Sequence, residues 1–349
     1  MMTHRERILA ALRHEQPDRW PTDMWATGEV FDKLRAHLGV ATNLAVYDAL
    51  DIDGIMELVP PYIGPEPKHT AEYRVNEWGM GHRTQAVEGA TYEEQVFYPL
   101  AEAETIADLE AYQWPSPDWY DYGKLPELAA QFPGRAIGCG YTAVFFLHNL
   151  LRGLGTSLMD PLLKPEFTLY FEQRLSDFYT EYHRRCFEAL RGIVDTTQVT
   201  DDLGMQTGLL ISPAVFERFY RPFMQRAIDL AHSYGITVFH HDDGDLRGLL
   251  PQLTEMGIEV LNPIQWRCGN WDLAALKAQY GRRLCFHGGV DNQYTLPFGT
   301  PDEVRTEVRR LKATLGADGT GYIIGPCHNL QGITPVENIL ALYETAHEA

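Results

Sequence analysis

The stretch SPAVFERFYRPFMQRAIDLAHSYGITVFH, residues 212–240, decides the fold because it joins a helix pattern directly to a strand pattern. Ser212 is a typical helix N-cap, Pro213 suits a first helical turn, and Gly235 is a typical stop. The run ITVFH that follows is short, apolar and rich in β-branched residues, as a buried strand would be. The stretch therefore predicts one helix–strand unit of a parallel sheet.

The same unit recurs along the chain. The segment TPDEVRTEVRRLKATLG begins with Thr300 as cap and Pro301 in the first turn, and it ends at Gly316. Strand-like runs occur at residues 20–26, 52–58, 136–141, 193–200, 236–240, 258–264, 283–289 and 321–326. Eight βα units predict an α/β fold, a closed (β/α)8 TIM barrel that uses residues 1–349 as a single domain. A doubly wound sheet is the alternative, but no G-x-G-x-x-G motif follows an early strand.

One segment is too long for a βα loop and a single helix. Residues 59–135 contain EYRVNEWGMG (72–81) and ATYEEQVFYPL (90–100), two alternating runs separated by glycine-bearing turns. This pattern is typical of a β-hairpin. We expect residues 59–135 to form an insertion after the second strand that covers the mouth of the barrel.

Composition excludes several classes of protein. The formal charge of −19 would repel a phosphate backbone, so nucleic acid is not an expected partner. The five cysteines are odd in number and widely spaced, unlike a disulfide framework or a zinc ribbon. No apolar run is long enough to suggest a membrane span, and the first residues lack the apolar core of a secretory signal. We therefore expect a cytoplasmic protein.

Polar side chains follow the predicted strands at end after end. The carboxyl ends of barrel strands carry the active site in this architecture. The residues at these ends are Asp23, Glu57, Tyr141, Asp201, Asp202, His240, His241, Asp243, Asn262, Gln265, His287, Asp291, Cys327 and His328. Loops are polar in any protein, and for a single residue that explanation is sufficient. The recurrence of histidine and acid indicates a functional rim.

The run HHDDGD, residues 240–245, is the densest of these groups. His241 and Asp243 are spaced closely enough to bind one metal ion, and a third ligand could come from Cys327 or His328. Imidazole and carboxylate suit zinc, manganese, cobalt or iron. The alternative is that the acids cap the following helix while the histidines bond locally.

Several motifs in order resemble the uroporphyrinogen decarboxylase superfamily across nearly the whole chain. They are RERILAALRHEQPDRWP, DDLGMQTGLLISPAVFERFYRPF, HHDDGDLRGLLPQLTEMGIEVLNPIQ, CFHGGVDNQYTLPFGTPDEV and GPCHNLQGITPVENI. The resemblance implies a (β/α)8 barrel, and it implies a homodimer whose barrel mouths face one another. The superfamily includes porphyrinogen decarboxylases and the methyltransferases that move methyl groups between corrinoid proteins and thiols.

The chain departs from both branches. Where a decarboxylase carries an arginine-rich element that grips carboxylates, this sequence reads MWATGEV (24–30), without arginine. The essential acid of that branch would correspond to Glu57. The methyltransferase branch holds zinc with H-x-C-G and a later cysteine; here Asp243 replaces the first cysteine, and His328, preceded by Cys327, takes the second position. The resulting set of His, Asp and His is harder and suits an oxygen nucleophile better than a thiol.

These observations predict a metal-dependent enzyme, with zinc the expected divalent ion, that performs methyl transfer or related chemistry on a small organic substrate. A separate corrinoid protein is a possible partner. The expected metal ligands are His241, Asp243, His328 and Cys327, the expected catalytic residues are Glu57, Asp202 and His287, and the expected substrate-binding residues are Trp25, Tyr62, Tyr141, His240 and Gln265. Two alternatives are a metal-free decarboxylase, with Glu57 as acid and His328 orienting the substrate, and a non-catalytic module that binds a corrinoid or a metabolite.

Overall fold

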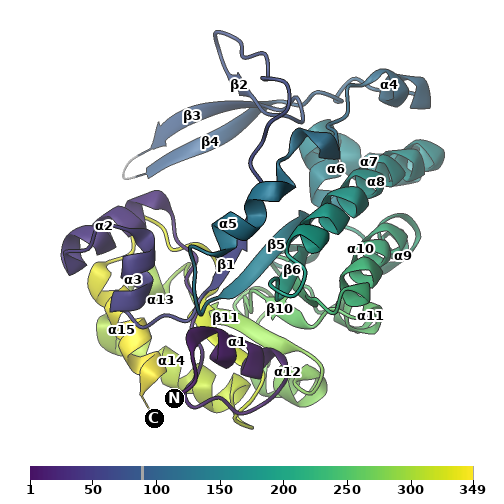
Figure 1. The fold of residues 1–349 in the computed structure, drawn as a ribbon. Coiled ribbons are helices and arrows are strands. Elements are labelled where there is room, and N and C mark those ends of the chain that lie inside the picture. The colour runs from purple at the N-terminus through teal and green to yellow at the C-terminus, as the bar shows by residue number, and fades with distance from the viewer. Residues whose placement is uncertain (88–89, 349) are drawn as a thin grey trace.

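Figure 1 shows a computed structural model that describes residues 1–87 and 90–348. Its main sheet has seven parallel strands in the order β1-β5-β6-β9-β10-β11-β12. The strands are β1 (Ile55–Leu58), β5 (Ala136–Thr142), β6 (Thr196–Val199), β9 (Thr237–His241), β10 (Val260–Asn262), β11 (Cys285–Val290) and β12 (Tyr322–Pro326). Each strand overlaps one of the runs expected from the sequence, and the α/β, TIM-barrel-like architecture is confirmed.

The first of the eight predicted strands is not a regular strand. Its residues form only isolated parallel bridges with the β12 side of the sheet, from Thr22 to Ile324 and from Ala26 to Leu330. On the other side, the Gly54 amide just before β1 donates to the Thr22 carbonyl at 2.9 Å. The extended segment thus links the two edge strands. Pro21 has no amide hydrogen to donate, which limits the ladder that this segment can form.

Helices connect the strands and cover the outside of the sheet (Figure 1). They are α1 (His4–Leu12), α2 (Gly28–Leu38), α3 (Asn43–Ala49), α4 (Ile106–Ala111), α5 (Leu125–Ala129), α6 (Val144–Arg152), α7 (Leu154–Leu163), α8 (Pro165–Ala189), α9 (Pro213–Phe219), α10 (Arg221–Ser233), α11 (Leu250–Met256), α12 (Leu273–Tyr280), α13 (Thr295–Phe298), α14 (Pro301–Leu315) and α15 (Val336–His347).

The predicted caps are present, but one predicted helix is two. The Ser212 side chain accepts from the Val215 amide, and Thr300 forms a capping box with Glu303. The segment 212–235 divides at Tyr220 into α9 and α10. Pro222 causes the division, because a proline lacks the amide that an uninterrupted helix would need at that position.

A small antiparallel sheet lies between β1 and β5 in the sequence and apart from the main sheet in Figure 1. It contains β2 (Arg74–Val75), β3 (Gly81–Val87) and β4 (Ala90–Phe97), and β3 pairs with both neighbours. The sequence predicts a hairpin between residues 72–81 and 90–100. In the structure the strand that pairs with β4 is β3, residues 81–87, so the predicted position of the first hairpin strand is wrong. Arg83 and Thr84 in β3 are exposed, so no apolar alternation marks this strand. Residues 88–89 lie outside the described part of the chain.

An apolar floor closes the amino-terminal end of the barrel. One residue from each of six strands packs there, and Ile8, Ala11 and Leu12 of α1 cover them from below. The strand residues are Ile55, Ala136, Phe239, Val260, Cys285 and Ile323. Helix α1 therefore acts as the plug of the barrel, on the side opposite the strand ends that carry the histidines.

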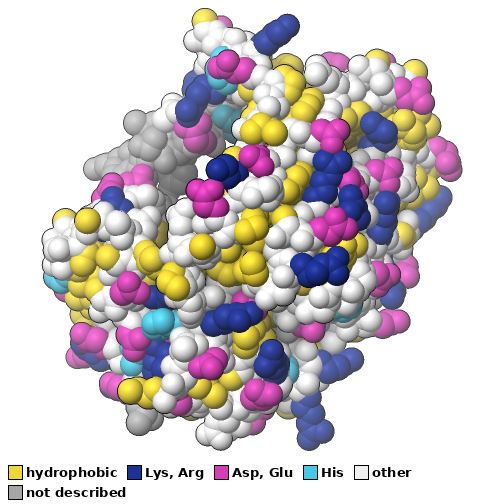
Figure 2. Space-filling model, in the orientation of Figure 1, with side chains coloured by type: hydrophobic (Ala, Val, Ile, Leu, Met, Phe, Trp, Pro, Cys, Tyr) yellow, Lys and Arg dark blue, Asp and Glu magenta, His cyan; other side chains and the backbone are white. Residues whose placement is uncertain are grey.

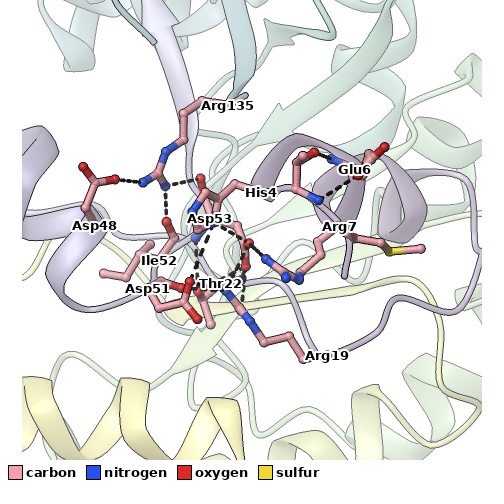
Figure 3. A network of polar contacts seen from close by, with 12 residues as sticks. His4, Glu6, Arg7, Arg19, Thr22, Asp48, Asp51, Ile52, Asp53 and Arg135 are labelled. Carbon is pink, nitrogen blue, oxygen red and sulfur yellow. Dashed lines mark hydrogen bonds and ion pairs between the residues drawn. The ribbon is translucent and has the colours of Figure 1, made fainter. Parts of the chain in front are cut away.

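A charged network ties this plug to the strands (Figure 3). The fully buried Asp53 carboxylate accepts from Arg7 Nη1 at 3.1 Å and from Arg19 Nη1 at 2.8 Å. It also accepts from the Thr22 amide at 3.0 Å and contacts His4 Nδ1 at 3.0 Å. A buried carboxylate with this many donors is compensated for its lost hydration, so the network stabilises the floor.

On the face shown in Figure 2, Lys and Arg side chains are interspersed with Asp and Glu rather than gathered into one basic patch. Among the described residues, none of the helices is long and apolar enough to cross a bilayer.

Candidate metal centre

The candidate site lies in the second layer of side chains inside the barrel, directly above the apolar floor. Successive side chains of a strand alternate between its two faces, so a residue two positions beyond a floor residue points into the same interior. Moving two positions on from Ile55, Phe239, Val260 and Cys285 gives Glu57, His241, Asn262 and His287. The apolar floor is thus followed directly by a polar layer at the carboxyl ends of the strands, where barrel active sites lie.

Three of the predicted metal ligands converge at this level. His241, Asp243 and His328 each offer one ligand atom, and these atoms all lie within 4.8 Å of one another. Asp243 bridges the histidines: its Oδ1 is 4.0 Å from His241 Nε2, and its Oδ2 is 3.7 Å from His328 Nε2. All three side chains are half-buried, so a ligand can reach them.

The imidazole of His241 is held from behind. Its Nδ1 lies 2.6 Å from Asn262 Oδ1, and since that oxygen can only accept, Nδ1 carries the proton and Nε2 keeps its lone pair for the cluster. Asn262 Nδ2 in turn donates to His287 Nδ1 at 2.6 Å. His287 Nε2 then donates to Asp23 Oδ2 at 3.0 Å.

The loop after β9 fixes Asp243. Gln265 Nε2 donates to Asp243 Oδ1 at 2.9 Å, and Gln265 Oε1 accepts from the Gly244 amide at 2.7 Å. Gly244 has φ +91°, and a Cβ there would lie 2.5 Å from the Met205 amide nitrogen, so the loop requires glycine. The Asp243 amide faces Asp202 Oδ1 at 3.4 Å. Gln265, predicted to bind substrate, thus positions Asp243.

Trp25 forms one wall of the centre. Its ring centroid lies 5.2 Å from that of His241, 6.0 Å from His287 and 6.4 Å from His328. The predicted wall residue is therefore in contact distance of both candidate histidine ligands, and it restricts their rotation.

Two acids at the carboxyl ends of the strands, Asp202 and Glu57, have raised pKa values. Partial burial raises the pKa of Asp202, an effect that nearby His241 opposes and the Asp243 carboxylate reinforces. Glu57 reaches solvent, but the protein around its carboxyl raises its pKa to about 7 despite a hydrogen bond from Gln198. A Cβ on Gly138 would lie 2.2 Å from Glu57 Oε1, so that glycine makes room for the side chain. Glu57 is thus suited to proton transfer at neutral pH.

Two predicted site residues face away from the cluster. His240 is fully buried, its Nδ1 donates to the Val199 carbonyl at 2.8 Å, and burial lowers its pKa to about 4. It directly precedes His241 on the strand, and alternation turns it to the opposite face. Cys327 is buried as well, and its Sγ lies 3.3 Å from the Ile264 carbonyl oxygen. The structure thus places His240, predicted to bind substrate, away from the cluster, and Cys327 is not part of the converging group.

The two predicted tyrosines occupy different places. Tyr141 is exposed at the carboxyl end of β5, and its pKa is raised first by surrounding protein and then by Asp201 and Asp202. It remains a candidate wall near Asp202. Tyr62 packs against Trp119 and Tyr120, and its hydroxyl donates to the Pro65 carbonyl at 2.7 Å. None of the contacts described for Tyr62 brings it to the cluster.

Sequence reasoning assigned no role to three residues that support the site. Asp23 and Asn262 were noted only as strand-end residues, and Gln198 was not singled out. For Asn262 the signal was its position in the strand alternation: it lies two positions beyond the floor residue Val260, as His241 lies two positions beyond Phe239. Knowing which strand positions face inward would have identified Asn262.

The donor set fits a divalent ion. Two atoms each about 2.0–2.1 Å from a tetrahedral zinc lie about 3.4 Å apart, slightly less than the 3.7 and 4.0 Å observed here. Small side-chain rotations would close the difference.

Among the described residues, no Lys or Arg forms an ion pair with Asp23, Glu57, Asp202 or Asp243. A cation would therefore be stabilised by carboxylates that no Lys or Arg of the described residues neutralises.

The fold and this rim define the class of protein: a barrel scaffold of the kind enzymes use, with its polar centre at the carboxyl ends of the strands. The model of the family described as uroporphyrinogen decarboxylase (URO-D) matches residues 151–349. The chain belongs to the URO-D family.

Curated relatives show how divergent this member is. The uroporphyrinogen decarboxylase of Herminiimonas arsenicoxydans is 28% identical over 101 residues, which are 28% of this chain and 26% of that protein. The uroporphyrinogen decarboxylase of Solibacter usitatus is 30% identical over 133 residues, 38% of this chain and 36% of that protein. The matched segments thus span only about a quarter to a third of these relatives.

A solved structure is similar over the full length. The methyltransferase from Methanosarcina mazei superposes with a TM-score of 0.64 and 21% identity, covering 99% of this chain and 98% of that one. At this identity the likeness shows the fold alone.

Proposed function

We propose that this chain is a metal-dependent enzyme that transfers a methyl group, or carries out closely related chemistry, on a small organic substrate. His241, Asp243 and His328 would hold the ion, and zinc is the expected one. The observation that carries the proposal is the convergence of these three ligand atoms within 4.8 Å of one another. Three protein ligands leave a coordination position for substrate or water, as catalytic zinc sites do.

The bound ion would lower the pKa of an oxygen nucleophile or polarise a substrate oxygen. The chain's own residues supply the rest. Trp25 and Tyr141 would form the walls against which the substrate lies. Glu57, with a pKa of about 7, would donate a proton to, or accept one from, the reacting oxygen. In the transfer the bond from oxygen to methyl carbon breaks, the oxygen keeps the electron pair, and the methyl group passes to an acceptor nucleophile.

The partners of this reaction follow from the same proposal. A separate corrinoid protein is the proposed methyl carrier, and it would have to approach the strand ends that carry Trp25 and His328. A homodimer with facing mouths remains an expectation that light scattering tests. The insertion between β1 and β5 remains the proposed cover of the mouth.

A metal-free decarboxylase is the second candidate, and the raised pKa of Glu57 favours it. A carboxyl group that is partly protonated near pH 7 can protonate the carbon from which CO₂ leaves. In that case His328 would orient the substrate directly. Among the described residues, no Lys or Arg pairs with Asp23, Glu57, Asp202 or Asp243, and residues 24–30 contain no arginine, which argues against a substrate with several carboxylates.

The experiment is metal analysis of protein purified without chelator or affinity metal, followed by turnover of candidate methyl donors before and after the metal is removed. We expect about one ion per chain and activity that is lost and regained with it. Activity that survives complete metal removal would favour the decarboxylase. Ligand binding without any turnover would favour a non-catalytic module that binds a corrinoid or a metabolite.

A matched pair of variants sharpens this experiment. Asp243→Ala should release the ion and abolish turnover while the fold persists, because a half-buried loop carboxylate contributes little to the core. Asp245→Asn is the control, since Asp245 pairs with Arg247 at 2.7 Å and is outside the converging group. Metal loss in both variants would mean that the loop, rather than the Asp243 ligand, was affected.

A further inference from the structure

Four side chains from four separate segments form a continuous hydrogen-bonded chain behind the candidate metal centre. Asp23 lies in the extended first segment, His287 on β11, Asn262 on β10 and His241 on β9. Asp23, His287 and Asn262 are almost fully buried, at 1%, 2% and 1% exposure. We call these four residues the relay.

With Asp23 ionised and His287 neutral, each link of the relay has only one compatible direction. Asp23 Oδ2 accepts, so His287 Nε2, 3.0 Å away, must carry a proton. In the neutral imidazole His287 Nδ1 is then an acceptor, which turns the NH₂ of Asn262 toward it at 2.6 Å. The Asn262 carbonyl oxygen therefore faces His241 and requires a proton on its Nδ1, at 2.6 Å.

These directions determine which nitrogen of His241 carries the proton. With the proton on Nδ1, the Nε2 of His241 presents a lone pair toward Asp243, 4.0 Å away. With the opposite tautomer, Nε2 would carry a hydrogen, and His241 could not bind a metal through that atom. The identity of a buried group three links away therefore decides whether His241 is a ligand.

We propose that Asp23, His287 and Asn262 are positioning residues that set the ligand-competent tautomer of His241. This inference rests on the proposed metal centre. It assigns Asp23 a role through the relay without contact with the ion, and it assigns His287 to orientation of a ligand in place of the acid–base role expected from the sequence. Partners of this kind typically change metal affinity by about 10–100-fold.

Asp23 itself is anchored independently of the relay. Its Oδ1 accepts from the Met24 amide at 2.8 Å and from the Ile55 amide at 3.4 Å. An asparagine at position 23 can keep that oxygen in place and present NH₂ where Oδ2 now lies. Asp23→Asn is therefore nearly isosteric but inverts every link: His287 Nε2 would accept, the Asn262 amide would turn over, and His241 would carry its proton on Nε2.

The first experiment needs no metal. In ¹⁵N-histidine-labelled apoprotein, the nitrogen chemical shifts report which ring atom of His241 carries the proton. We expect Nδ1–H in the wild type and Nε2–H in Asp23→Asn. A wild type with Nε2–H, or the same tautomer in both proteins, would overturn the proposal whether or not the chain binds an ion.

The second experiment measures Co²⁺ affinity by the visible absorption of the bound ion. Asp23→Asn should weaken binding by about 10–100-fold. The control is Asp195→Asn, another buried carboxylate, which binds Arg5 at 2.7 Å near the floor; it should leave the affinity unchanged. Equal affinities in wild type and Asp23→Asn would overturn the relay. A wild type that binds no Co²⁺ would contradict the proposed function instead, and the NMR result would still decide the relay.

A second variant separates tautomer control from a merely structural role. In Asn262→Asp, a carboxylate accepts from His287 and from His241 at once, so His241 keeps its proton on Nδ1 whatever residue occupies position 23. In this background Asp23→Asn should change Co²⁺ affinity by less than about twofold, because the two positions no longer communicate. An unchanged effect of Asp23→Asn in the Asn262→Asp background would mean that Asp23 acts through packing, and would overturn the proposal.

Discussion

Phe239 and His241 lie two positions apart on β9 and point into the same barrel interior, where both contact Trp25, but most of their other neighbours differ. Phe239 packs in the floor with apolar residues from the other strands and from α1. His241 contacts Asn262, Asp243 and Trp25 in the polar layer above. The same strands therefore build a layer that stabilises the fold and a layer that can bind a ligand. A shift of two residues along one strand is therefore enough to move from a position that stabilises the fold to one that can bind a ligand.

Exchanging each residue for alanine should separate the two layers most clearly. Phe239→Ala removes a ring with 2% exposure and should lower the free energy of unfolding by about 3–5 kcal/mol. His241→Ala should change the free energy of unfolding by less than about 1 kcal/mol, because the side chain is half-buried. Metal titration of folded protein should show the reverse order, with the larger loss of affinity in His241→Ala and a smaller one in Phe239→Ala, whose ring contacts Trp25 and His287 but no ligand. Two variants with equal losses of stability would contradict the division.

The charged network of the floor allows a second comparison. Asp53→Asn leaves Arg7 and Arg19 without their buried carboxylate (Figure 3). Removing one partner of a buried pair typically costs about 3–5 kcal/mol, and the several remaining hydrogen-bond partners place this variant near the lower figure. Urea denaturation should show the loss, while metal affinity of the folded protein stays normal. A weakened metal site in Asp53→Asn would mean that the floor and the mouth are coupled.

A softer ligand in the mouth should change which metal is preferred. Asp243→Cys restores the residue that the related methyltransferase branch carries at this position. Thiolate binds zinc better than it binds manganese, so the ratio of Zn²⁺ to Mn²⁺ affinity should rise on the order of tenfold. Competition between the two ions followed by elemental analysis measures this ratio. An unchanged ratio would indicate that residue 243 does not contact the ion.

The smallest expected effect concerns the pH dependence of stability. Glu57 has a pKa of about 7 in the folded chain, above the ordinary 4.5, so the native state holds its proton more tightly than the unfolded state does. Its ionisation therefore destabilises the fold progressively from pH 4.5 to 7 and by a constant amount above that. Glu57→Gln should stabilise metal-free protein at about pH 8 relative to about pH 5. The exposed Glu255 offers the control, since Glu255→Gln should show no such difference.

Much of the barrel could be predicted because its strands are short apolar runs between well-capped helices. The run 236–240 and the cap Ser212 were visible in the sequence. The irregularity of the first strand could not be predicted, because residues 20–26 have the apolar pattern of a strand. In the structure they form only isolated bridges, and Pro21 lacks an amide hydrogen for a continuous ladder of hydrogen bonds. The exposed strand β3 gave no apolar alternation to detect.

The sequence identified most residues of the candidate site, but not which way their side chains point or which hydrogen bonds they form. The H-x-D spacing brought His241 and Asp243 together, and the order of motifs added His328. The adjacent pairs His240–His241 and Cys327–His328 could not be resolved, because a shift of one residue reverses which side chain faces inward. The hydrogen bonds of Asn262 join residues more than twenty positions apart in the sequence, and the pairing of β10 with both β9 and β11 places them side by side.

The most direct test of the metal centre is anomalous diffraction at the zinc edge, from crystals of protein purified without chelator or affinity metal. We expect one peak in the polar layer, about 2.0–2.2 Å from His241 Nε2, an Asp243 carboxylate oxygen and His328 Nε2. Cys327 should stay turned toward Ile264. No peak at this position, in protein that turns over substrate at its full rate, would contradict the account.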